Sequence, residues 1–168
     1  MTEQERHLCE LACWAAEAKR RPAGNTRVPE TLIREFILYK WTARNGADVG
    51  CRYWSDAALI YYAAHGLYAA NSRKRALRHE HVIPRTYLMP GLLTLVTVEQ
   101  VFEYLNIFCF GCIMTLAEEK SISSKLRSSM PAGWDGIDVW TRYRHAFAAC
   151  GISIWEVDER LHRLRTCY

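Results

Sequence analysis

The sequence predicts an α+β fold, in which a single, mostly helical domain carries a small β-hairpin. The chain has 168 residues, of which half are apolar and 24% are charged, and this composition suits one domain with a substantial core. Apolar residues recur at helical spacing behind good helix-capping residues in most of the chain. Two short segments, at 77–83 and 107–115, instead have the character of strands.

Residues 1–70 form the predicted helical N-terminal part. Thr2 can cap a first helix, with Glu5 at the capping-box position. A second helix should start at Pro29–Glu30 and stop at Asn45–Gly46. Its apolar side is expected to consist of Leu32, Ile33, Phe36, Ile37 and Trp41.

A third helix should follow a short irregular link at 48–52. Ser55 has the character of its N-cap, and the helix is expected to end near Gly66. The remaining chain then divides into a hairpin-and-helix core at 73–125 and a C-terminal part at 126–168 made of a loop and helices.

The predicted core begins with the strand at 77–83, because Pro84 favours an extended conformation for the residue before it. The apolar residues from 87 to 95 are ambiguous, and Pro90–Gly91 marks a turn or a helix start. Thr97 can cap the next helix, with Gln100 at its third position. A second strand then ends at Thr115, which can cap a further helix with Glu118 at its third position.

The C-terminal part begins with the clearest loop in the chain, Ser128–Asp138. A helix is expected from Val139 to Cys150, and a short third strand from Ile152 to Val157. Asp158 is expected to cap a last, basic helix that runs to the C-terminus.

The net charge of +4 is a mild basic excess that is compatible with nucleic acid. Seven cysteines are scattered through apolar segments, and the chain starts without a secretory signal. This pattern is typical of reduced, buried thiols in a cytoplasmic protein. No run is long and apolar enough to span a membrane, so we expect a cytoplasmic protein with no membrane partner.

Groups that do chemistry concentrate in one segment, where Glu80 stands between His79 and His81 and the surrounding cations are Arg73, Lys74, Arg75, Arg78 and Arg85. On a strand, the two histidines would share one face and Glu80 would point the other way, unless a strand end or bulge brings all three together. Both imidazoles are candidate general bases, and imidazole plus carboxylate suits a catalytic divalent metal, Mg²⁺ or Mn²⁺. The cations would hold phosphates, which together indicates phosphodiester hydrolysis.

The run Glu80-His81-Val82-Ile83-Pro84 resembles the acid-His-aliphatic-x-Pro opening of the HNH, or His-Me finger, endonucleases. That family has a compact hairpin and helix around one metal ion. The resemblance covers roughly residues 78–125 and implies that Glu80 binds the metal and His81 activates water. It also implies that Glu118 or Glu119, in the first turn of the helix after the second strand, reaches the metal. These glutamates stand where the family has a final His or Asn, and Asn106 is the candidate for its middle Asn.

Three functions are therefore weighed. The first is an HNH-like metal-dependent endonuclease that acts on nucleic acid, with DNA as the expected substrate. The second is a non-catalytic interaction protein, such as an anti-CRISPR-like inhibitor from a mobile element, which binds a complex that processes nucleic acid. The third is a helical regulator with a helix-turn-helix, although the link at 45–53 is longer than the usual turn. An inactive HNH scaffold kept for binding, or plain surface hydrogen bonds and an ion pair with Arg78 or Arg85, would also explain the central segment.

Overall fold

Three helices start at capping boxes, the strongest local signals in the sequence. The hydroxyls of Thr2, Thr97 and Thr115 each accept a hydrogen bond from the backbone N–H three residues later, and the side chain there bonds back. The helices that follow are α1 (Glu3–Arg20), α6 (Val98–Phe108) and α7 (Leu116–Ser121). These three predicted helix starts are confirmed.

The computed structural model describes most of the chain, namely residues 1–21, 27–43, 51–71, 76–122, 126–148, 150–158 and 160–167, with the side chains of 67–71 excepted. The expected helix stop at Asn45–Gly46 and the cations Arg73, Lys74 and Arg75 lie outside the described residues.

The second helical stretch changes its winding in the middle. It consists of α2 (Arg27–Thr31), a π-helical segment (Leu32–Ile37) and α3 (Leu38–Ala43). In the π-helical segment the N–H of Leu38 bonds to the carbonyl of Ile33, five residues back, which shifts the later residues around the helix axis. Ile33, Ile37 and Trp41 are buried as expected, but Phe36 is exposed, so its predicted place on the buried side is wrong.

Helix α4 (Asp56–Asn71) begins where the sequence predicts. The Ser55 hydroxyl accepts a hydrogen bond of 3.1 Å from the N–H of Ala58, as an N-cap does. Gly66 has a φ of 66° and breaks the helical geometry near the predicted end, but the helix resumes and runs on to Asn71.

The described strands form one mixed sheet of five, in the order β2-β3-β1-β4-β5. The strands are β1 (Tyr53–Ser55), β2 (Leu77–His81), β3 (Gly111–Thr115), β4 (Ile154–Val157) and β5 (Arg163–Thr166). Strand β1 is parallel to β3, and the other neighbours are antiparallel. The α+β, mostly helical single-domain class is confirmed, and the predicted hairpin is the β2–β3 pair at one edge of this sheet.

Two of the observed strands, β1 and β5, differ from the predicted secondary structure. Residues 53–55, beside the predicted irregular link, form β1, and the predicted last helix is replaced by β5. Asp158 caps a turn instead, because its Oδ1 accepts from the N–H groups of Arg160 and His162 at 2.8 Å each. The buried carboxylate of Glu156 on β4 then pairs with Arg165 on β5 at 2.6 Å, which favours a hairpin over a helix.

The ambiguous residues after β2 form helix α5 (Arg85–Thr94), whose N-cap is Pro84. The predicted turn or helix start at Pro90–Gly91 is therefore wrong, since both residues lie inside the helix. The ring of Tyr104 on α6 packs against Gly91, where a β-carbon would collide with it, and its hydroxyl donates to the carbonyl of Leu88 at 3.1 Å. The predicted loop at 128–138 is confirmed, and the helix after it is α8 (Thr141–Phe147).

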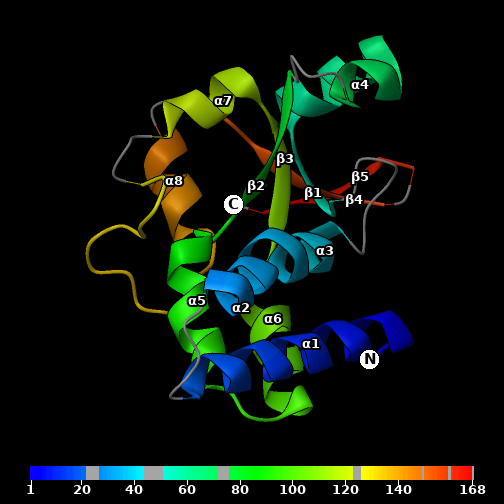
Figure 1. Cartoon of the computed structure of the whole chain (residues 1–168). Helices are drawn as coiled ribbons and strands as arrows, with labels where there is room; N and C mark the ends of the chain where they lie inside the picture. The colour runs from blue at the N-terminus through cyan, green and yellow to red at the C-terminus, as the bar shows by residue number, and fades with distance from the viewer. Residues whose placement is uncertain are drawn as a thin grey trace.

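The main core lies between the sheet and the helices α1, α3, α5, α6 and α8. In Figure 1, α1, α5 and α6 gather below the sheet, α7 and α8 lie to its left, and α4 projects at the upper right. A smaller cluster under α4 contains Trp54, Leu77 and Ile113. None of the helices in the described ranges has both the length and the apolar character that crossing a membrane requires.

Candidate functional site

Strand β2 carries the His-Glu-His segment and pairs evenly with β3. Its last two residues lie opposite Cys112 and Gly111, and no register shift interrupts this pairing. The imidazole rings of His79 and His81 lie side by side, with centroids 5.3 Å apart, and Glu80 projects to the other face. The predicted alternation is confirmed, and no bulge brings the carboxylate around to the imidazoles.

Glu80 forms an ion pair with Arg142 of helix α8. Its Oε1 is 2.8 Å from Nη2 of Arg142, and the arginine side chain is completely buried. Burial raises the pKa of Glu80, and the charge and hydrogen bond of Arg142 act in the opposite direction. The ion pair that sequence reasoning placed with Arg78 or Arg85 therefore belongs to Arg142.

The Arg142 guanidinium also serves three carbonyl groups. Its Nε donates to Val82 at 2.8 Å, its Nη1 donates to Leu126 at 3.0 Å, and its Nη2 donates to His81. The planar guanidinium thus donates to carbonyls at the end of β2 and in the chain that leads into the loop before α8. Nothing in the sequence around residue 142 indicates this role, because every partner is 16 or more residues away.

Glu118 is held by short hydrogen bonds. Its Oε2 accepts from the Ser55 hydroxyl at 2.6 Å and from the N–H and hydroxyl of Thr115 at 2.8 and 2.9 Å. Glu119 lies nearer the candidate site, with its Oε2 3.9 Å from Nε of Arg78. The structure therefore brings Glu119 toward β2 and uses Glu118 to fasten α7 to β1.

Helix α3 covers the histidine face of β2. The Thr42 hydroxyl lies 2.9 and 3.1 Å from the Tyr39 and Leu38 carbonyls, to which it donates, and 2.9 Å from Nε2 of His79. Because its hydrogen is used within the helix, it accepts from His79, which assigns the Nε2–H tautomer to that ring. A β-carbon at Gly111 would lie only 2.5 Å from the same Nε2, so glycine is required there.

Both histidines are neutral at pH 7. Burial, with the Arg85 charge, lowers the pKa of His79 to about 4. Burial, followed by the charges of His79 and Arg85, lowers the pKa of His81 to about 3, although the Leu38 backbone acts the other way. His81 is 7% exposed, and its Nε2 is buried without a hydrogen-bond partner among the described residues.

A pocket of about 560 Å³ opens at the edge of β2. Both histidines and Glu80 line it. Three arginines and an exposed tyrosine from different parts of the chain line it as well, namely Arg78, Arg85, Arg127 and Tyr39. Arg127 is exposed and makes no ion pair with any residue that the structure describes. Sequence reasoning found Arg78 and Arg85 and missed Arg127 and Tyr39, because neither belongs to a motif.

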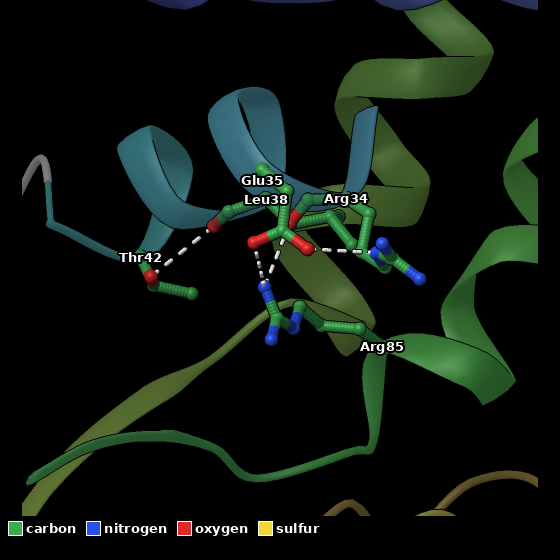
Figure 2. Close-up of polar contacts among 5 residues, drawn as sticks. All are labelled: Arg34, Glu35, Leu38, Thr42 and Arg85. Carbon is green, nitrogen blue, oxygen red and sulfur yellow. Dashed lines mark hydrogen bonds and ion pairs between the residues drawn. The ribbon is translucent and has the colours of Figure 1, made fainter. Parts of the chain in front are cut away.

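Arg85 is fixed in place by the π-helical segment. Its Nη1 lies 3.0 Å from Oε2 of Glu35 and 3.1 Å from the carbonyl of Arg34. Figure 2 shows the Glu35 carboxylate between the guanidinium groups of Arg34 and Arg85. One carboxylate thus pairs with two arginines, and this group of three side chains carries an excess of one positive charge.

The pocket and the side chains that pair with its lining carry a net positive charge. Among the described residues, four arginines face three carboxylates there, namely Arg78, Arg85, Arg127 and Arg142 against Glu35, Glu80 and Glu119. Since the histidines are neutral, one positive charge is in excess, and an anionic ligand is favoured.

The donor set does not match the divalent metal site that the HNH resemblance implies. Glu80 is occupied by Arg142, Glu118 accepts three hydrogen bonds, and His81 lies on the opposite face from Glu80. Within the described ranges, no group of three His, Cys, Asp or Glu residues is arranged to bind a metal ion. Asn106 lines a different, smaller pocket with Trp41 and Arg52.

The chain was compared with protein-family models, curated proteins and solved structures, and none of them matched.

Replacing Arg142 with Met should lower the free energy of unfolding by about 3–5 kcal/mol, because it leaves the half-buried Glu80 carboxylate without its cation and three carbonyls without their donor. The control is Arg144→Met on the same helix, where the arginine is 45% exposed and pairs with Asp138, and its loss should cost less than about 1 kcal/mol. Urea unfolding measures both, and equally small losses would contradict the role of Arg142.

Acid should destabilise the protein through the two histidines. Their folded-state pKa values of about 4 and 3 lie below the ordinary 6.5, so the unfolded state binds more protons below pH 6.5. The stabilisation is therefore complete above pH 6.5 and declines as pH falls, by about 1.4 kcal/mol per pH unit for each histidine.

His81→Leu should reduce the slope of the unfolding free energy against pH between about pH 5 and 6.5, by about 1.4 kcal/mol per pH unit. At pH 7 its unfolding free energy should lie within about 1.5 kcal/mol of the wild type, since the lost Nε2 has no partner among the described residues. The exposed His7→Gln variant controls for loss of a histidine. An unchanged slope in His81→Leu would show that His81 does not titrate as described.

Proposed function

We propose that this protein binds nucleic acid at the open edge of β2, where it contacts the phosphate backbone of the nucleic acid without hydrolysing it. The observation that carries this proposal is the convergence of Arg78, Arg85 and Arg127 on one pocket with excess positive charge. Guanidinium groups bind phosphate oxygens in pairs of parallel hydrogen bonds. Arg127 is the most available of the three, since it makes no ion pair with a described residue.

The state of the histidines supports binding rather than cleavage. A general base works best when its pKa lies near the operating pH, whereas burial lowers the pKa of His79 and His81 to about 4 and 3. Imidazoles with such low pKa values take up protons weakly at neutral pH. A protein that occupies a strand without cutting it would also keep a nucleic-acid-processing complex away from that strand, so the proposal is compatible with the non-catalytic interaction protein.

Hydrolysis of the HNH type is the second candidate. It is favoured by the order of strand β2, strand β3 and helix α7, in which the two strands pair and the helix contacts both. Two imidazoles that line one cationic pocket also favour it. Against it, the two carboxylates that would bind the metal accept hydrogen bonds from other side chains, Glu80 from Arg142 and Glu118 from Ser55.

Arg127→Gln should weaken binding of a fluorescein-labelled DNA strand and reduce the salt dependence of the affinity. Each phosphate contact contributes about 0.7 to the slope of log K against log salt for a single strand, so the slope should fall by about that amount. The matched control is Arg160→Gln, an exposed arginine that lines a different pocket. Fluorescence anisotropy across salt concentrations measures both, and equal slopes in the two variants would contradict the assignment.

A cleavage assay separates the two candidates. Plasmid and single-stranded DNA are incubated with Mg²⁺ or Mn²⁺ and with wild type, His81→Leu or a chelator. The proposal expects binding without cutting in every reaction. Cutting that disappears both in His81→Leu and with the chelator would establish the nuclease instead.

A further inference from the structure

We propose that the pocket at the edge of β2 takes an unpaired nucleotide, whose base stacks on Tyr39 while Arg78, Arg85 and Arg127 bind the flanking phosphates. This inference rests on the proposed function and names its ligand class, single-stranded nucleic acid. Three features of the pocket carry it, namely the fixed position of the tyrosine, the concave shape and the peptide groups of His79 that no described hydrogen bond uses.

The Tyr39 ring is exposed to solvent, and a contact with His79 restricts its position. It is 45% exposed at the pocket wall, and it makes an edge contact with the His79 ring, with centroids 4.9 Å apart at an angle of 65°. His79 is itself fixed by Thr42, whose hydroxyl lies 2.9 Å from the carbonyl of Tyr39. An aromatic ring fixed in this way stacks on a base with little loss of side-chain freedom.

The shape of the pocket favours an unpaired base. Its walls come from α3, the start of α5 and the segment before the loop, so Tyr39 forms part of a concave site of about 560 Å³. In a duplex the bases are stacked inside the helix and only phosphates and groove edges face outward. A tyrosine on such a wall reaches the face of a base only when that base is unpaired.

The open edge of β2 adds peptide groups that can bind the base. The N–H of Val82 bonds to Phe110 at 2.9 Å and that of Leu116 bonds to Ala76 at 2.7 Å. Even-numbered residues of β2 therefore face β3, and odd-numbered ones face the open edge. At that edge the carbonyls of Leu77 and His81 accept from Arg78 and Arg142.

The N–H and the carbonyl of His79 are thus directed toward the pocket, and the described hydrogen bonds do not use them. One donor and one acceptor side by side match the edge of a base, which also presents donors and acceptors together. The same pair could extend the sheet with a peptide strand, but the arginines and the exposed tyrosine favour a nucleotide.

The test compares three labelled oligonucleotides of about 15 nucleotides by fluorescence anisotropy. They are a single strand, an abasic strand with the same number of phosphates, and a duplex. The single strand should bind about 5- to 100-fold more tightly than the abasic strand, which is the effect of stacking one base. Tyr39→Leu should bring the single strand to the affinity of the abasic strand, and Tyr39→Phe should retain the preference.

The control variant is Tyr87→Leu, which removes a tyrosine that is 48% exposed but lines a different pocket, and it should retain the preference. Circular dichroism checks that each variant is folded. Equal binding of the single and abasic strands, or preference for the duplex, would overturn the unpaired nucleotide and leave phosphate binding intact. Absence of binding to all three would overturn the proposed function as well and leave a peptide strand as the alternative ligand at the edge of β2.

Discussion

The buried guanidinium of Arg142 connects helix α8 to the end of β2 and to the chain before the loop. Burying an arginine costs several kcal/mol unless its donors are satisfied, and here they meet one carboxylate and three carbonyls. These bonds fix the point at which the chain leaves the sheet and turns through Pro84 into α5. The position of Arg85 at the start of α5, and hence one wall of the pocket, depends on this junction.

The same junction divides β2 into two sides with different roles. Glu80 faces Arg142 and stabilises the fold, whereas His79 and His81 face α3, and all three residues line the pocket. An acid beside a histidine at a strand end suits a nuclease, and it equally suits a buried ion pair next to a packed imidazole. The partner that the structure shows for Glu80 is Arg142, on another element of the fold.

The features that the sequence predicted correctly depend on neighbouring residues. The capping boxes at Thr2, Thr97 and Thr115 each need two side chains three positions apart, and the alternation along β2 needs only an extended backbone. The errors depend on distant partners. Strand β1 lies between β3 and β4, and β5 is stabilised by the pairing of Glu156 with Arg165.

The candidate site follows the same rule. The cations near β2 were predicted because they are close to it in sequence, whereas Arg127 and Tyr39 reach it only through the packing of α3 and of the segment before the loop. Glu118 was identified both as a helix-capping residue and as a metal ligand by resemblance. The structure shows the helix-capping contacts, in which Ser55 and Thr115 donate to its carboxylate.

The most direct measurement is an NMR titration that follows the arginine side-chain Nε–H resonances while a single-stranded oligonucleotide is added. We expect that the resonances of Arg78, Arg85 and Arg127 shift and that the resonance of buried Arg142 does not. Shifts confined to Arg160, Arg163 and Arg165, at the other end of the sheet, would contradict it.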